Sequence, residues 1–70
     1  MKLNALMDAY GNDDILVTVY DSNTKEYISN SVERRELMHS EGYEKIADRT
    51  VCTYRFCATS DGNEMWVSLY

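Results

Sequence analysis

The shortness of this chain constrains its fold more than any motif does, because 70 residues suffice for only one hydrophobic core. A chain of this length buries only about 60% of the surface that it exposes when unfolded, so the core is thin and the stability margin is small. We therefore expect residues 1–70 to form one domain. Association with another protein or with a second copy, as a homodimer, would increase the stability of such a domain.

The composition is typical of a folded acidic protein. Hydrophobic residues make up 44% of the chain and aromatic residues 11%, which is more than disordered segments contain. The net charge of −5 at pH 7 repels the phosphates of nucleic acids and anionic lipids. No apolar run approaches the length of a transmembrane helix. We expect a protein partner with a basic surface, and no direct binding of nucleic acid or of a membrane.

The two cysteines indicate a reducing compartment. Cys52 and Cys57 lie five residues apart in a segment with the pattern of a strand, and this odd spacing places their side chains on opposite faces. A disulfide between them within that strand is therefore excluded. The sequence also begins without a signal-peptide pattern, so we expect a cytoplasmic protein with free thiols.

The spacing of hydrophobic residues predicts elements in the order α-β-β-α-β-β. Two hairpins that join into one antiparallel sheet of about four strands, with the helices on one face, bury these elements most simply, so the expected fold class is α+β. The expected helices cover residues 2–10 and 32–39. The expected strands cover residues 15–20, 25–29, 50–59 and 65–70.

Local signals set the borders of these elements. Asn30 and Glu33 have the spacing of a capping box, which predicts that a helix starts after Asn30. Asp61 and Gly62 form a dipeptide that favours the tight turn of a hairpin. The residues expected to be buried hold the apolar positions of the clearest elements, and they are Leu6, Val17, Val19, Tyr54, Phe56, Val67 and Leu69.

No catalytic or metal-binding arrangement is predicted. His39 is the only histidine, and it falls among solvated residues near the end of the second expected helix, where it is a poor base for a nucleophile. A cysteine–histidine pair using Cys52 or Cys57 is a minor alternative, since cysteines inside a strand usually serve packing. Zinc needs about four ligands, and the chain has neither a CxxC nor a paired-histidine spacing. We expect no enzyme activity, no metal and no cofactor.

Aromatic residues are the first candidates for a binding surface. Six tyrosines and one tryptophan exceed what so small a core needs, so several of them should be partly exposed. Tyrosine and tryptophan often anchor protein interfaces, and we take Tyr20 and Trp66 as candidate partner-binding residues. Alternatively, these rings cover the open face of the sheet as stabilising cross-strand pairs.

Acidic residues are the second candidates. Asp13 and Asp14 follow the first expected helix, and Glu33, Glu36 and Glu41 mark the second. An acidic patch of these five residues would present carboxylates where a basic, nucleic-acid-binding groove expects phosphates. The alternative is that they form an ordinary solvated helix surface.

Three segments resemble the small acidic proteins of Gram-positive phages and prophages: KLNALMDAYG (residues 2–11), VTVYD (residues 17–21) and the hairpin at Asp61 and Gly62. That group includes anti-CRISPR proteins, small inhibitors that bind a CRISPR effector and commonly block its nucleic-acid site with acidic residues. The resemblance implies a DNA-mimicking inhibitor of a basic nuclease or CRISPR effector in the host bacterial cytosol. No signature residue transfers with it. The alternative function is a self-associating regulatory or assembly module without enzymatic activity.

Overall fold

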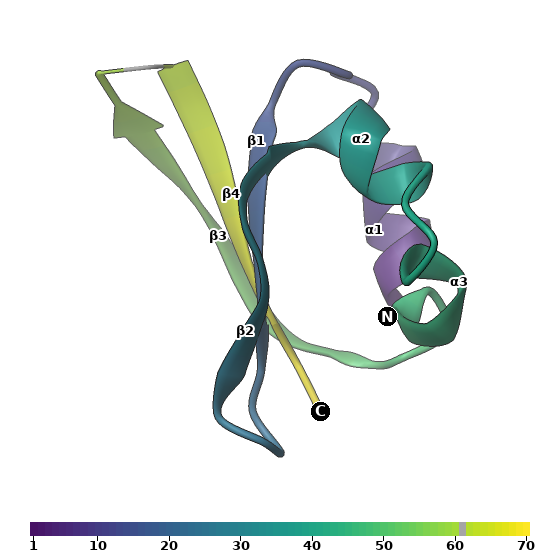
Figure 1. The fold of residues 1–70 in the computed structure, drawn as a ribbon. Coiled ribbons are helices and arrows are strands. Elements are labelled where there is room, and N and C mark those ends of the chain that lie inside the picture. Colours follow the sequence, from purple (N-terminus) through teal and green to yellow (C-terminus); the bar gives the residue numbers. More distant parts are fainter. Residues whose placement is uncertain (61) are drawn as a thin grey trace.

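The chain folds into an α+β domain in which helices cover one face of a sheet, as Figure 1 shows for the computed structural model. The structure describes residues 1–60 and 62–70. Helices α1, α2 and α3 all lie on the same side of the sheet (Figure 1). The elements of the described residues are α1 (Leu3–Ala9), β1 (Leu16–Asp21), β2 (Glu26–Glu33), α2 (Arg34–Met38), α3 (Tyr43–Ile46), β3 (Val51–Thr59) and β4 (Gly62–Leu69).

The sheet is mixed, so the prediction of a purely antiparallel sheet is wrong. Its strand order is β2-β1-β4-β3, with two antiparallel hairpins and a parallel pair, β1 and β4, in the middle. The connection that contains α2 and α3 returns along the covered face from the end of β2 to the start of β3, and such crossovers join strands of the same direction. β4 therefore runs in the direction of β1. Hydrophobic alternation predicts the two faces of a strand but carries no information on its direction.

The core lies between α1 and the two central strands. Leu3, Leu6 and Met7 have the spacing of one helical face, and all three are buried. The expected burial of Leu6 and of the residues on β1 and β4 is confirmed. The apolar core residues are Leu3, Leu6, Met7, Ile15, Val17, Val19, Leu37, Ile46, Met65, Val67 and Leu69.

The expected burial of Tyr54 and Phe56 is wrong, because the two side chains are 43% and 49% exposed. Each is opposite a buried residue of β4, so the alternation assigned them to the correct, helix-covered side. β3 is an edge strand, however, and Phe56 there contacts the ring of Tyr10, with the two centroids 5.0 Å apart. Alternation shows which face a residue occupies, whereas its burial also depends on the position of the strand in the sheet.

The predicted start of the second helix is also wrong. β2 extends to Glu33, so Asn30 and Glu33 lie in a strand and form no capping box. The helix begins at Arg34, whose backbone N–H donates to the main-chain oxygen of Ile15 at 2.8 Å. This long-range contact outweighs the local capping signal. A turn containing Gly42 then separates α2 from α3, which gives the order α-β-β-α-α-β-β.

The predicted hairpin of β3 and β4 forms, but Gly62, expected in its turn, is the first residue of β4 and pairs with Thr59. Asp61 of the predicted turn lies outside the described residues. Gly62 has a φ of 124°, which glycine adopts without strain. Cys52 and Cys57 on β3 are both free thiols.

Candidate functional site

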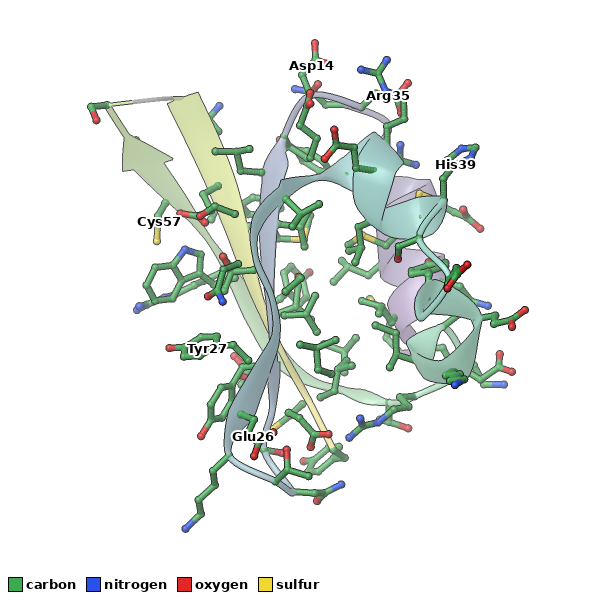
Figure 2. All side chains as sticks on the ribbon, in the orientation of Figure 1. Asp14, Glu26, Tyr27, Arg35, His39 and Cys57 are labelled. Atoms are coloured by element: carbon green, nitrogen blue, oxygen red, sulfur yellow. The ribbon has the colours of Figure 1, made fainter. Side chains whose placement is uncertain are left out.

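The face of the sheet that carries no helix, here termed the uncovered face, presents aromatic and polar side chains. Val19 and Val67 point into the core, so their neighbours on β1 and β4 point the opposite way. Figure 2 shows Tyr27 and Cys57 on this side of the sheet, away from the helices. The uncovered face is formed by Thr18, Tyr20, Tyr27, Arg55, Cys57, Glu64, Trp66 and Ser68.

Aromatic rings dominate the uncovered face. Tyr20 and Tyr27 are opposite each other on β1 and β2, with ring centroids 5.1 Å apart in an edge-to-face arrangement. A cross-strand ring pair of this kind stabilises a hairpin. Tyr27 is nevertheless 56% exposed and Trp66 39% exposed, so large parts of both rings face solvent. Cross-strand pairing therefore explains how the tyrosines are arranged but not why so much ring surface is left open.

A hollow of about 270 Å³ lies between Trp66 and the two tyrosines, and we term it the aromatic slot. On the side of Trp66 toward β3, the guanidinium carbon of Arg55 lies 5.1 Å from the ring centroid in a cation–π contact. The slot lies on the side of Trp66 toward β1. It is lined by Thr18, Tyr20, Tyr27, Trp66, Val67 and Ser68.

A buried carboxylate, that of Glu64, lies next to the aromatic slot. It is only 6% exposed, and its Oε1 accepts hydrogen bonds from Ser31 Oγ at 2.5 Å and from Thr18 Oγ1 at 2.8 Å. Hydrogen bonding by Ser31, Thr18 and Trp66, in order of decreasing effect, lowers the pKa of this carboxyl group, while burial opposes that change. Glu64 is therefore ionised at neutral pH. In the described part of the chain, no cation forms an ion pair with it.

Ser31 reaches Glu64 because β2 is irregular. The register between β1 and β2 shifts on both sides of Val19, and Ser31 has a φ of 49°, in the left-handed region that few residues other than glycine adopt. The backbone N–H of Ser31 donates to Thr18 Oγ1 at 2.9 Å. A strained residue thus links β2, β1 and β4 in one hydrogen-bond network. Such strain persists where the surroundings hold it in place, often at functional sites.

The structure gives the predicted site residue Asp13 a structural role. Its Oδ1 lies 2.6 Å from Nη1 of Arg34, a residue that is only 8% exposed. Arg34 Nε also donates to the main-chain oxygen of Met7 at 2.8 Å, which fixes the guanidinium under α1. Asp13 therefore compensates a buried charge, and a partner could use this carboxylate only by weakening that pair.

Asp14, Glu33 and Glu36 lie at the same end of the domain as Asp13, where β1 and α2 begin. Arg35, labelled with Asp14 in Figure 2, belongs to this end as well, because its backbone N–H donates to the main-chain oxygen of Asp13 at 3.3 Å. Its Nη2 lies 4.0 Å from Glu33 Oε2. The acidic cluster therefore also contains positive charge, which the sequence-based hypothesis did not take into account.

The remaining predicted site residues lie elsewhere. Glu41 belongs to the turn between α2 and α3 on the helical side of the domain. Tyr20 and Trp66 share the uncovered face and both line the aromatic slot. The structure therefore brings the two predicted aromatic residues together, while the five predicted acidic residues are divided between the α2 end of the domain and the helical side.

Sequence reasoning missed Glu64, Ser31 and Arg55 as parts of this surface. Glu64 lies directly before the expected strand of residues 65–70, so the strand pattern did not assign its side chain to either face. Its burial comes from Ser31 on β2, which no local pattern connects to β4. The turn predicted at Asp61 and Gly62 places Arg55 on the same face of the hairpin as Trp66, but opposite Ser68. The structure instead pairs Arg55 with Trp66.

Groups typical of metal binding do not come together in residues 1–60 and 62–70. No group of three or more His, Cys, Asp or Glu side chains there has the arrangement of a metal site. His39 is exposed on the helical side, across the molecule from Cys57 (Figure 2). None of the described helices is long and apolar enough to cross a membrane.

Comparison with protein-family models, with curated proteins and with solved structures gives no match to this chain. Neither the fold nor the aromatic slot can therefore be assigned a role by likeness.

Proposed function

We propose that this chain is a binding protein without enzymatic activity, which occupies the nucleic-acid site of a basic protein in the host cytosol. Its most specific form is an inhibitor of a CRISPR effector, as the resemblance to anti-CRISPR proteins implies. The observation that best supports a binding role is the exposed aromatic surface of Tyr27 and Trp66 on the uncovered face. Tyrosine and tryptophan are enriched among the residues that dominate binding energy at protein interfaces.

The distribution of charge supports a basic partner. The net charge is −5, and several carboxylates on the helical side and at the α2 end form no ion pair within the described residues. Exposed carboxylates attract the Lys and Arg side chains of a nucleic-acid-binding groove and speed association with it. These exposed residues are Asp8, Asp14, Glu36, Glu41 and Glu44.

A DNA-cleavage assay with a purified RNA-guided nuclease tests this proposal. Increasing amounts of the chain should stop cleavage near one molecule per enzyme, and DNA bound beforehand should protect the enzyme, because both compete for one groove. Raising the salt several-fold should weaken inhibition, since charges are screened over about 8 Å at physiological ionic strength and over shorter distances at higher salt. Cleavage that is unaffected across a panel of such nucleases would contradict the inhibitor form.

The β3 edge supports a second candidate, a self-associating regulatory or assembly module. β3 is an outer strand of the sheet, so one row of its backbone N–H and C=O groups has no neighbouring strand among the described elements. Tyr54 and Phe56 on this strand are 43% and 49% exposed. An exposed edge with apolar side chains is a template for pairing with a second copy.

Light scattering on the purified chain separates the two candidates. A dimer at micromolar concentration that Phe56→Arg converts to a monomer, together with no inhibition of cleavage, would support the assembly module. A monomer that inhibits cleavage would support the inhibitor.

A further inference from the structure

The aromatic slot and Glu64 together form a site that suits a positively charged side chain. Resting on the proposed function, we propose that the slot holds a lysine or arginine side chain of the protein partner. Its volume of about 270 Å³ accommodates one such side chain. Three observations support this assignment: the aromatic residues that line the slot, the negative charge of Glu64, and the contact of Arg55 with Trp66.

Three of the six residues that line the slot are aromatic. Tyr20 and Tyr27, a ring pair across β1 and β2, and Trp66 on β4 contribute these rings. The faces of aromatic rings carry negative potential and attract a cation within about 6 Å of the ring centroid, with tryptophan the strongest. Arg55, at 5.1 Å from the Trp66 centroid, shows that this indole ring already accepts a guanidinium. Trp66 also lines the slot, so the same ring is within reach of a cation bound there.

Glu64 supplies a negative charge beside these rings. Its carboxylate is 6% exposed and is hydrogen-bonded to neutral side chains rather than to a cation. Hydrogen bonds keep this group ionised, so its negative charge is available to attract a cation bound nearby. Thr18 both lines the slot and donates to Glu64 Oε1 at 2.8 Å, so one side chain separates the charge from the slot. A lysine or arginine in the slot would therefore find a partner charge at short range.

The same aromatic face also has features of a stacking platform for nucleic-acid bases. Charge argues against that occupant. Arg55 is the only basic residue among those that form the described uncovered face, and Glu64 together with the net charge of −5 repels phosphates. The observations therefore favour a basic side chain.

The indole N–H of Trp66 provides a direct readout, because Trp66 is the chain's only tryptophan and gives one indole cross-peak in a ¹H–¹⁵N spectrum. A capped hexa-arginine peptide is titrated into the protein, with hexa-citrulline as a control of nearly the same shape without the charge. The arginine peptide should shift the cross-peak saturably, and the citrulline peptide should bind at least about tenfold more weakly. Equal binding of the two peptides, or no shift with either, would overturn the proposal.

Matched variants test each part of the slot. Tyr27→Ala removes one aromatic ring of the slot and should weaken binding of the arginine peptide about 3–10-fold. Tyr27→Phe keeps the ring and should leave the affinity for the peptide unchanged. Glu64→Gln keeps a hydrogen-bond acceptor, removes the charge and should weaken binding by a similar factor. Asp14→Asn, which neutralises a carboxylate outside the slot, should have no effect on the Trp66 cross-peak. Wild-type binding by both Tyr27→Ala and Glu64→Gln would show that the slot assignment is wrong.

Two further outcomes would also overturn the slot proposal. An oligo(dT) strand that shifts the Trp66 cross-peak at lower concentration than hexa-arginine would identify a nucleic-acid surface instead. If Trp66→Ala inhibits the nuclease as strongly as the wild type does, the slot is not part of the interface. The proposed inhibitor function would still hold in that case. Loss of the slot and loss of the inhibitor function are therefore distinguishable.

Discussion

Asp21 and Arg49 form an ion pair with two contacts, in which Nη1 lies 2.8 Å from Oδ2 and Nη2 lies 3.1 Å from Oδ1. Asp21 ends β1, and Arg49 lies just before β3. Arg49 Nε also donates to the main-chain oxygen of Tyr70 at 2.9 Å. The pair therefore fixes the point at which β1, the segment after β4 and the helical connection meet.

This ion pair should make stability sensitive to acid. Hydrogen bonding from Arg49 holds the pKa of Asp21 well below its ordinary value of 3.8, although burial opposes the change. A carboxyl group whose folded pKa is lowered stabilises the fold fully above its unfolded pKa and loses this effect as pH falls toward the folded pKa. We therefore expect a constant Tm near neutral pH and a falling Tm below about pH 5.

Asp21→Asn tests the origin of that acid sensitivity. The variant should have a lower Tm than the wild type at pH 7 and should lose less Tm on acidification, both followed by circular dichroism. Asp14→Asn, at an exposed position, serves as the control with a wild-type profile. Parallel pH profiles for the wild type and Asp21→Asn would show that the pair has no such role.

Truncations on β4 and β3 should differ in cost. Leu69 is fully buried, so Leu69→Ala should lower the free energy of unfolding by about 3 kcal/mol through lost burial and the cavity left behind. Phe56 is 49% exposed, and Phe56→Ala should cost less than half as much, or about 1 kcal/mol. Urea unfolding measures both values. Equal losses would mean that β3 is covered in solution, in contrast to its position at the edge of the sheet.

Charge reversal should destabilise the fold at one of two neighbouring aspartates and have little effect at the other. Asp13→Lys leaves the buried guanidinium of Arg34 without its partner and should cost about 2 kcal/mol or more. Asp14→Lys changes an exposed side chain and should stay within about 0.5 kcal/mol. Thermal melts of the two variants provide the comparison. A similar Tm for both variants would show that the ion pair of Asp13 with Arg34 contributes little to stability. If the Tm values differ as expected, only Asp14→Lys is suited to binding studies.

Much of the secondary structure was predictable because local spacing controls it. The alternation on β1 and β4 and the helical spacing of Leu3, Leu6 and Met7 identified three elements and the residues that they bury. The parallel pairing of β1 and β4 was not predictable, since it follows from the path of the helical connection. The start of α2 was not predictable either, because it depends on the contact of Arg34 with Ile15 rather than on the Asn30 signal.

Less of the candidate site was predictable. Tyr20 and Trp66 were identified as candidates because tyrosine and tryptophan are typical of interfaces, and the structure places both in the aromatic slot. Glu64 could not be identified, because its burial depends on a hydroxyl from β2 that reaches it only through the irregular backbone at Ser31. Contacts that span three strands have no counterpart in local sequence spacing.

The most direct test of whether the uncovered face is the binding surface compares two aromatic truncations. The measurement is the Kd of each variant for a nuclease that the chain inhibits. Trp66→Ala removes a ring that is 39% exposed on that face, and Phe56→Ala removes one that is 49% exposed on the other side of the sheet. Circular dichroism first shows that both variants are folded. We then expect Trp66→Ala to raise the Kd about 30-fold, which is the effect of an interface hot spot. Phe56→Ala should change the Kd by less than about threefold. A loss of affinity confined to Phe56→Ala, or no loss with either variant, would contradict this account.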